Sequence, residues 1–323
     1  MANPYSVEQY KKAILANDRA MLSRAITMIE STRTDDKKQA SDLIDSILPY
    51  AGKSIRIGIT GVPGVGKSTF IEAFGMALIA MGKKVAVLAI DPSSSISHGS
   101  ILGDKTRMEQ LSVHPHAFIR PTASSGSLGG ITYKTHETIL LCEAAGFDVI
   151  IVETVGVGQS ETEVSQICDF FLLLMLAGAG DELQGIKRGI MELADGVVIT
   201  KADSGNAEKA KAARSEYARA LHFMPPTASG WIPQVKVCSA YQNEGIKEVW
   251  EMISQFIQQQ STNGYFYENR KQQNIFAFHR LLQEQLRDML LRKPGLKEQI
   301  QALEQQITAG TMSPYTAVGL ILD

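Results

Sequence analysis

The chain has 323 residues and a mass of 35.2 kDa, and 44% of its residues are hydrophobic and 20% charged. This composition is close to the globular average and excludes collagen-like, mucin-like and wholly disordered proteins. The 32 basic and 34 acidic residues leave a formal net charge of −2, so no overall field favours nucleic acid or an anionic membrane as a partner. We therefore expect any bound anion to be held by a local site.

Three further features bear on the compartment. Residues 1–12 include two lysines but lead into no apolar stretch of the kind that makes a secretory signal. The longest apolar run, 170–180, is shorter than the roughly 18 residues that span a bilayer, so we expect a buried strand there. The cysteines, Cys142, Cys168 and Cys238, are odd in number and form no CxxC pair, which argues against a disulfide framework and a structural zinc site. We expect a cytoplasmic protein.

Along the chain, residues 1–50 show the apolar spacing of short amphipathic helices. From residue 51 to 262, short apolar runs alternate with helical stretches, which is typical of βαβ units. The runs are continuously apolar, so both faces of the sheet should be covered by helices and the strands should be mostly parallel. The expected strands are 55–60, 84–91, 148–154, 170–176, 195–200 and 234–238, with a shorter candidate at 117–122.

The tail, residues 263–323, changes character after a polar stretch at 258–265. Two apolar stripes at helical spacing flank the break at Pro294-Gly295, and Ser313-Pro314 suits the start of a last short helix. These stripes predict a helical hairpin, which either folds back on its own domain or, as we expect, buries its stripe against a second copy in a homodimer. The stripe residues are Ile275, Phe278, Leu282, Leu286, Met289 and Leu290, followed by Leu296, Ile300, Leu303 and Ile307.

The strongest motif is a GxxxxGK[ST] match placed between an expected strand and an expected helix over 67–81. Glycines let successive backbone N–H groups turn around phosphate oxygens, and the helix N-terminus adds its positive dipole end. The lysine then reaches the β- and γ-phosphates, and the serine offers a hydroxyl to Mg²⁺. The predicted nucleotide-binding residues here are Gly61, Val62, Pro63, Gly64, Val65, Gly66, Lys67, Ser68 and Thr69.

A second motif predicts which base is bound. Thr200-Lys201-Ala202-Asp203 ends an expected strand and matches the [NT]KxD form that reads guanine. A carboxylate at Asp203 can accept from guanine N1–H and its 2-amino group, whereas adenine would leave it unpaired. Ser239 and Ala240, after the next strand, resemble the loop that touches guanine O6. We therefore expect GTP rather than ATP.

Acids at neighbouring strand ends predict the metal side of the site. Asp91 and Glu153 each close an apolar strand, where ligands bind in parallel sheets, although Asp91 could instead cap the turn before Pro92. Glu153 opens an ExxG version of the usual DxxG, so the Gly156 N–H is expected to meet the γ-phosphate. Asp104 is a further candidate for metal contact. We expect Mg²⁺ held with Ser68, and GTP and GDP as substrate and product without a tightly bound cofactor of the protein's own.

Several motifs taken together resemble one family. GVPGVGKST, AIDPSS, VETVGVGQSE, GAGDELQGIKRGIMELAD and TKAD, in this order, look like the MeaB/ArgK group of P-loop GTPases, relatives of the methylmalonic aciduria type A protein. The resemblance spans essentially the whole chain. It implies a SIMIBI-class GTPase, a homodimer, which escorts adenosylcobalamin-dependent methylmalonyl-CoA mutase or a related acyl-CoA mutase. Its GTP cycle would gate cofactor delivery and protect the mutase.

The resemblance also assigns residues. It makes Lys67, Asp91, Glu153 and Gly156 the catalytic set, and Lys201 and Asp203 the guanine readers. The stretch 178–187 aligns with a third switch that relays the nucleotide state to the mutase, through Asp181, Glu182, Gln184 and Lys187. The group that orients water stays open between Gln159 and Arg107, so slow intrinsic turnover is expected.

Three other functions share parts of this pattern. A phosphotransferase, such as the transport-system kinase whose name also follows this family, would prefer ATP, against which Asp203 argues. A nickel metallochaperone would need clustered ligands. A scaffold that binds GTP without hydrolysing it is the third alternative. The histidines form no convincing cluster in the sequence; they are His98, His114, His116, His136, His222 and His279.

Overall fold

The computed structural model describes residues 4–31, 33–91, 108–123, 130–154, 160–177, 188–203, 205–224 and 227–322. The chain divides into two compact units, Met1–Ala277 and Phe278–Asp323.

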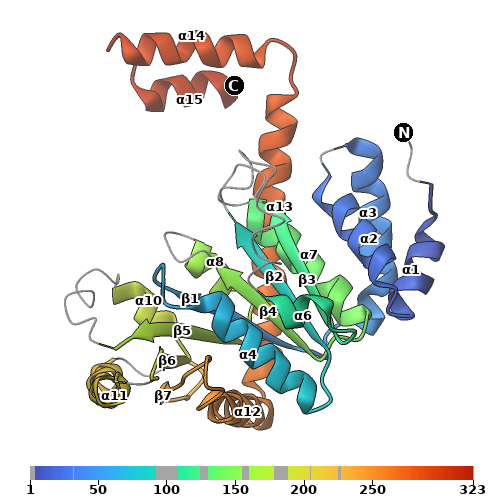
Figure 1. The fold of residues 1–323 in the computed structure, drawn as a ribbon. Helices are drawn as coiled ribbons and strands as arrows, with labels where there is room; N and C mark the ends of the chain where they lie inside the picture. The colour runs from blue at the N-terminus through green and yellow to red at the C-terminus, as the bar shows by residue number, and fades with distance from the viewer. Residues whose placement is uncertain are drawn as a thin grey trace. The chain divides into compact units, whose positions relative to one another are not determined.

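A parallel sheet forms the centre of the first unit (Figure 1). In the described part of the chain it has seven strands in the order β3-β2-β4-β1-β5-β6-β7, and all neighbouring pairs are parallel. Every strand expected from the sequence is confirmed, including the short candidate, and so is the α/β fold class. The strands are β1 (Ile55–Gly61), β2 (Val85–Asp91), β3 (Ala117–Ala123), β4 (Val149–Thr154), β5 (Phe170–Leu176), β6 (Gly196–Thr200) and β7 (Gln234–Val237).

Helices cover both faces of the sheet, as continuous apolar strands require. One face packs on α4 (Lys67–Ala80), α6 (Glu109–Val113) and α12 (Ile246–Thr262). The other face packs on two further helix groups that have their own cores. The first comprises α1 (Val7–Leu15), α2 (Arg19–Glu30), α3 (Thr34–Ile47), the 3-10 turn η1 (Leu48–Tyr50), α7 (Gly130–Ala144) and α8 (Ser160–Ser165); the second comprises α10 (Arg188–Leu193) and α11 (Ala207–His222).

The N-terminal helices belong to the same core as the sheet. Ser6 forms a capping box at the start of α1, and Asp18 caps α2, so both helices begin where their orphan N–H groups are satisfied. Apolar residues of α1, α2 and α3 then pack with those of α7. Glu30 at the end of α2 pairs with Arg120 of β3 at 2.8 Å. These helices therefore cover one face of the sheet instead of forming a separate body.

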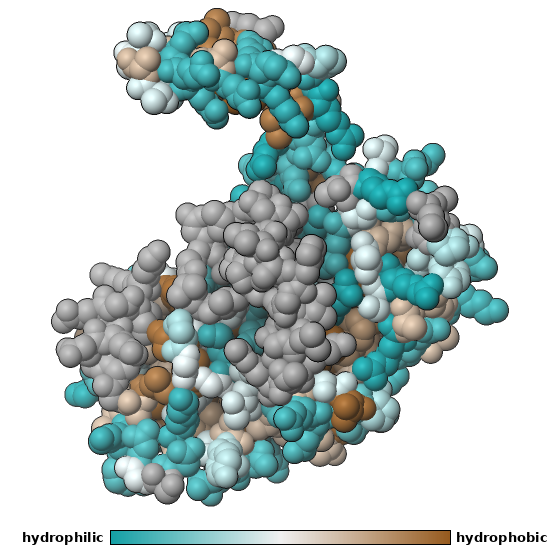
Figure 2. Space-filling view, turned by 45° about the horizontal axis from the view of Figure 1, so that its top comes forward, coloured by the Kyte–Doolittle hydropathy of each residue, from teal (hydrophilic) through white to brown (hydrophobic). Residues whose placement is uncertain are grey.

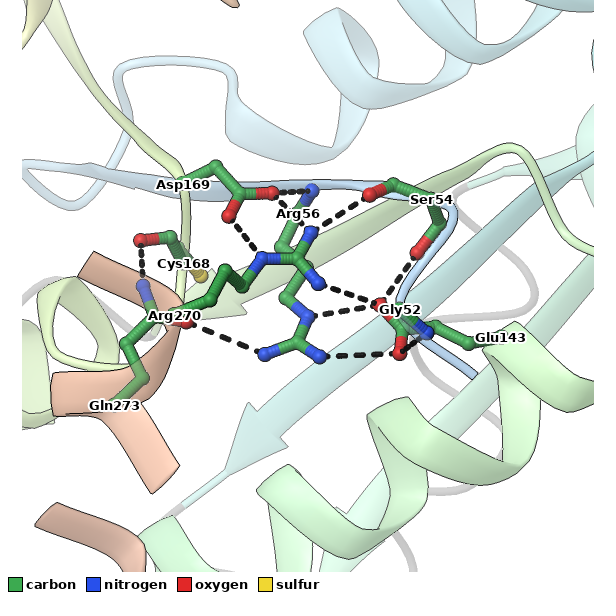
Figure 3. A network of polar contacts seen from close by, with 8 residues as sticks. All are labelled: Gly52, Ser54, Arg56, Glu143, Cys168, Asp169, Arg270 and Gln273. Atoms are coloured by element: carbon green, nitrogen blue, oxygen red, sulfur yellow. Dashed lines mark hydrogen bonds and ion pairs between the residues drawn. The ribbon is translucent and has the colours of Figure 1, made fainter. Parts of the chain in front are cut away.

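A buried polar cluster joins the start of α13 (Tyr265–Leu291) to the amino ends of β1 and β5 (Figure 3). The Arg56 guanidinium donates to both carboxylate oxygens of Glu143, at 2.9 and 3.0 Å. Arg270 pairs with Asp169, at 2.7 Å through Nη2, and with Glu143 at 3.2 Å. Gln273 accepts a bond from Arg56 at 3.2 Å. The two guanidinium groups and the two carboxylates of this cluster are thus paired with one another, which limits the free-energy cost of burying their charges.

The second unit contains the rest of α13, α14 (Leu296–Thr308) and α15 (Pro314–Leu322). Leu296 and Leu303 of α14 are buried, as is Ala317 of α15, whereas Ile300 and Ile307 are half-buried, so the second predicted stripe is partly covered within the tail. The first stripe stays exposed, with Phe278 at 59% and Leu286 at 47%. In Figure 2, α14 and α15 present a largely hydrophilic surface broken by hydrophobic patches. An exposed stripe of this kind is available for a partner.

The polar stretch 258–265, after which the tail was expected to change character, is helical at its start. Residues 258–262 lie inside α12, which ends at Thr262. Gln260 is fully buried there because it continues the inward face of Ile253 and Phe256. Glutamine is a good helix former, so the polar run extends the helix and the chain turns at Asn263-Gly264.

Among the helices that the structure describes, we find none with the length and hydropathy of a membrane span. The cysteines Cys142, Cys168 and Cys238 are free and buried. Burial raises the pKa of the Cys238 thiol to about 12, so this thiol stays protonated and unreactive.

Candidate functional site

The phosphate-binding motif forms the connection between β1 and α4, in the strand, loop and helix order that was predicted. Gly61 must be glycine because a Cβ there would lie 2.6 Å from the Leu174 carbonyl oxygen of β5. Gly66 has φ +91° and is the N-cap of α4, a backbone conformation that favours glycine. Val65 is fully buried and anchors the loop between them. The loop therefore leads directly to a helix N-terminus suited to an anion.

Lys67 folds over this loop. Its Nζ donates to the carbonyl oxygens of Gly61 at 2.7 Å and Val62 at 3.4 Å. Burial lowers the pKa of Lys67, and the charges of Glu153 and Glu161 oppose this effect. The ammonium group is thus held against the loop, where an incoming phosphate oxygen can accept hydrogen bonds from it.

The predicted metal-side residues Ser68 and Glu153 come together. Ser68 Oγ lies 3.5 Å from Glu153 Oε1, and Glu153 is 9% exposed. The register Ile59↔Glu153 between β1 and β4 places this acid beside the end of β1. Hard oxygen donors suit Mg²⁺, which usually keeps waters and phosphate oxygens as its other ligands, so these two residues fit the ion. Asp91 ends β2, the strand next to β4, and its side chain lies outside the described residues.

The predicted guanine-reading residues lie at the ends of β6 and β7, on the same carboxyl edge. Lys201 Nζ donates to the Gly64 carbonyl oxygen at 2.7 Å, which ties this motif to the phosphate loop. Asp203 Oδ2 accepts from Ser239 Oγ at 3.1 Å. The sequence suggested Ser239 as a backbone contact to the base, and the structure adds that its hydroxyl orients Asp203. Ala240 follows and is half-buried.

A buried hydroxyl links the two halves of the site. Thr200 Oγ1 donates to one of two carbonyl oxygens, that of Val65 at 2.7 Å or that of Met175 at 3.2 Å. The first residue of the TKxD motif therefore contacts the phosphate loop and β5 together. Because Thr200 is 2% exposed, the hydroxyl needs these acceptors to be buried without a penalty.

Other predicted residues fall outside the described part of the chain. This holds for the metal candidate Asp104, for Gly156, and for the two residues left open as water-orienting groups, Arg107 and Gln159. It also holds for the predicted relay residues, which are Asp181, Glu182, Gln184 and Lys187. Their assignments stay predictions.

Glu161 is an acid near the predicted site that the sequence did not single out. It lies in the first turn of α8, is fully buried, and its charge acts on Lys67. A buried acid whose charge acts on the predicted phosphate-binding lysine is a functional-site signal because burying its charge is costly. In the sequence the signal was faint: Glu161 ends the quoted stretch VETVGVGQSE, and its burial depends on how α8 packs on β1 and β4.

Comparison with known proteins agrees with this geometry. Residues 22–295 match the family described as "Methylmalonyl Co-A mutase-associated GTPase MeaB". The chain is 47% identical to a probable GTPase of Mycobacterium tuberculosis over 98% of its own length and 95% of that protein's. It is 44% identical to the GTPase ArgK of Escherichia coli, covering 98% of this chain and 96% of that one.

The chain is also similar to an animal protein and to a solved structure. The chain is 42% identical to the mitochondrial methylmalonic aciduria type A homolog of Mus musculus, covering 98% of this chain and 79% of that protein. It superposes on the crystal structure of a "LAO/AO transport system kinase" with a TM-score of 0.78 and 37% identity, covering 99% and 98% of the two chains. The family match spans most of the chain and the curated relatives are named GTPases, so this chain belongs to the MeaB family of P-loop GTPases.

Proposed function

We propose that the protein binds GTP at residues 61–69 and hydrolyses it to GDP and phosphate, with Asp203 reading the guanine. The support is geometric: the loop, Lys67 and the Asp203–Ser239 pair share one edge of the sheet. In this proposal Lys67 donates to the phosphate oxygens. Ser68 and Glu153 hold Mg²⁺, assisted by Asp91. Bound Mg²⁺ would neutralise negative charge on the β- and γ-phosphates. Gly156 stays the proposed sensor of the γ-phosphate.

We further propose that this GTPase acts as a chaperone of an adenosylcobalamin-dependent methylmalonyl-CoA mutase, gating cofactor loading and protecting the enzyme. The observation that carries the proposal is the match of residues 22–295 to a family described as mutase-associated. The similarity to the methylmalonic aciduria type A homolog supports it. The predicted relay at 178–187 would pass the nucleotide state to the mutase.

We propose that the protein is a homodimer through its tail, 263–323. The support is the apolar stripe on α13, which the described residues of the chain leave exposed from Ile275 at 49% to Met289 at 62%. A second copy can bury such a stripe by the same residues on both partners, as a two-fold interface requires. The α14 stripe is partly covered within the tail and that of α13 is more exposed, so α13 is the proposed contact.

The chaperone proposal is tested by binding and loading together. Purified protein is mixed with the methylmalonyl-CoA mutase of the same organism, in GDP and in a non-hydrolysable GTP analogue, and the complex is measured by size-exclusion chromatography. Transfer of adenosylcobalamin to the apo mutase is then followed by absorbance. We expect a complex in at least one nucleotide state and loading that changes with the nucleotide. Absence of a complex in both states would reject the mutase as partner.

The same preparation tests the kinase alternative, which the name of the similar crystal structure motivates. Incubation with γ-labelled GTP and γ-labelled ATP should release labelled inorganic phosphate from GTP and label no added protein. Label on an added binding protein, with ATP as the better donor, would favour a phosphotransferase instead.

A further inference from the structure

Two threonine hydroxyls meet in the core directly beneath the phosphate site. Thr154 Oγ1 donates to Thr60 Oγ1 at 2.8 Å. Thr60 is 1% exposed and Thr154 is fully buried. Thr60 immediately precedes Gly61 of the phosphate loop, and Thr154 immediately follows Glu153. The bond therefore joins the two strand ends that carry the phosphate-side chemistry.

The bond lies where the backbone pairing of these strands stops. The registered pairs of β1 and β4 end at Ile59↔Glu153, one residue before the two threonines. On its other side β1 stays paired with β5 as far as Gly61↔Leu174. The end of β1 is thus held to β5 by the sheet, whereas its attachment to the end of β4 passes through the threonine side chains.

This attachment lies next to Glu153, whose backbone is paired with Ile59 of β1 and Ala89 of β2. Its carboxylate lies 3.5 Å from Ser68 on the first turn of α4, and its charge acts on Lys67. Thr154 follows Glu153 directly on β4. A shift of the end of β4 relative to β1 therefore moves the Glu153 carboxylate relative to Ser68 and Lys67. A displacement of about 1 Å at such a site is enough to slow a reaction by up to a hundredfold.

We infer that Thr60 and Thr154 form a positioning pair for GTP hydrolysis, which holds Glu153 at the correct distance from Ser68 and Lys67. The inference rests on the proposed nucleotide site at residues 61–69. Neither threonine is a catalytic residue, since both act through Glu153. The pair fixes the distance between the start of the phosphate loop and Glu153, which neither the GxxxxGK[ST] motif nor the ExxG motif fixes by itself.

A purely structural role makes a different prediction from a positioning role. Replacing one threonine with valine leaves the other hydroxyl buried and unpaired, which destabilises the fold. Replacing both removes the unpaired group, so stability returns towards wild type. Two methyl groups, however, pack at about 3.5 to 4.0 Å, about 1 Å wider than the hydrogen bond. The double variant is therefore a stable protein with a widened strand end.

The experiment compares Thr60→Val, Thr154→Val, the double variant and Thr154→Ser in the full-length chain. Turnover of GTP, affinity for a fluorescent GDP and thermal unfolding are measured for each. We expect the double variant to recover the stability that Thr154→Val loses, yet to keep a kcat at least about tenfold below wild type. Its GDP affinity at saturating Mg²⁺ should stay within about twofold, because the phosphate loop keeps its contacts to β5.

Two readouts report on geometry without turnover. Mg²⁺ held at the proposed site should slow GDP release, and the double variant should need more Mg²⁺ for half of that effect, because Glu153 no longer faces Ser68 at the same distance. Thr154→Ser keeps the hydroxyl and should restore both kcat and the Mg²⁺ response. Thr138→Val is the matched control: Thr138 is fully buried on α7 and donates one 2.8 Å bond to the Lys134 carbonyl oxygen.

The outcomes separate the inference from the proposed function. Wild-type kcat in the stable double variant would overturn the positioning role, and so would an equal loss of kcat in Thr138→Val. A wild-type chain that neither binds GDP nor hydrolyses GTP would instead reject the proposed site. Loss of kcat that tracks loss of thermal stability across all variants would reduce the pair to a structural contact.

Discussion

Lys67 connects the phosphate loop with the acids around it. Its ammonium group donates to the loop carbonyls, while Glu153 and Glu161 supply negative charge nearby. These contacts hold the lysine in the place where a phosphate would take over as acceptor. We therefore expect the Lys67 ammonium to be needed for GTP hydrolysis more than for folding.

Lys67→Ala should lower GTP turnover by at least about a hundredfold, because a charge that stabilises the transition state is lost. Turnover is measured by phosphate release and folding by circular dichroism. Lys209→Ala, which removes an exposed lysine on α11, is the control and should hydrolyse GTP normally. Normal turnover in Lys67→Ala would remove the phosphate site from the account.

His136 provides a prediction about pH. Burial and the charge of Arg56 lower the pKa of His136 to about 4 from its ordinary 6.5, although Glu143 raises it. The folded protein therefore holds this imidazole neutral where the unfolded chain would protonate it. Its stabilising contribution is complete above pH 6.5 and is lost as the pH falls towards 4, by about 3 kcal/mol in total.

The check is urea unfolding at pH 7.5, 6, 5 and 4.5 for wild type and His136→Gln. The wild type should lose more stability than the variant across this range. Glu143, whose pKa burial would raise but Arg56 and Arg270 lower to about 2, contributes in a separate window below pH 4.5. Parallel curves for the two proteins above pH 4.5 would contradict the assignment to His136.

At the scale of elements, the sequence was a good guide to strands and a poor one to contacts. Continuous apolar runs such as 170–176 predict buried parallel strands because helices must cover both faces. The pairing of Arg56 with Glu143, distant in sequence, depends on where α7 packs, and no local pattern encodes it. The Thr60–Thr154 bond likewise depends on the register of β1 and β4.

The nucleotide-binding motifs were predictable from the sequence because they are local, as the apolar strands are. Phosphate binding is a local property of one loop and the helix start that follows it, so the motif at residues 61–68 predicts it from the sequence alone. The end of α12 within the polar stretch 258–265 could not be read from composition, because Gln260 is polar and yet continues the buried face of the helix. Glu161 was missed because its burial depends on tertiary packing.

The polar cluster of Figure 3 supports a prediction about the start of α13. Arg270→Met would leave Asp169 buried without its guanidinium partner, which should cost about 3 kcal/mol or more. Lys271→Met is the matched control, because Lys271 pairs with Glu268 at 2.9 Å on the surface and should cost less than about 1 kcal/mol.

Urea unfolding measures both variants, and hydrogen exchange of residues 265–277 locates the effect. Faster exchange there in Arg270→Met would show that the cluster holds the first half of α13 in place. Equal costs for the two substitutions would mean that the buried pairs stabilise α13 no more than a surface pair does.

For the whole molecule, the prediction concerns assembly. The exposed stripe on α13 includes Leu282 at 42% and Leu286 at 47% exposure. Leu282→Glu and Leu286→Glu should each place a charge in the proposed interface and shift the protein towards monomers, measured by light scattering during chromatography. Leu291→Glu is the control, since Leu291 is 37% exposed and lies on the opposite side of the helix.

Point substitutions are preferable to truncation here because the first half of α13 carries Arg270 and Gln273 of the buried cluster. Removing it would expose Arg56 and Glu143 and confuse unfolding with dissociation. A dimer that persists in both Leu282→Glu and Leu286→Glu would reject α13 as the contact.

The central claim is that a guanine nucleotide binds along residues 61–69 and is read by Asp203. Isothermal titration calorimetry with GDP, ADP and xanthosine diphosphate, on wild type and on Asp203→Asn, tests it most directly. The wild type should bind GDP and reject ADP, and Asp203→Asn should lose GDP and gain xanthosine diphosphate, whose C2 carbonyl can accept from the asparagine amide. Equal binding of GDP and ADP by the wild type, or unchanged GDP binding by Asp203→Asn, would contradict the account.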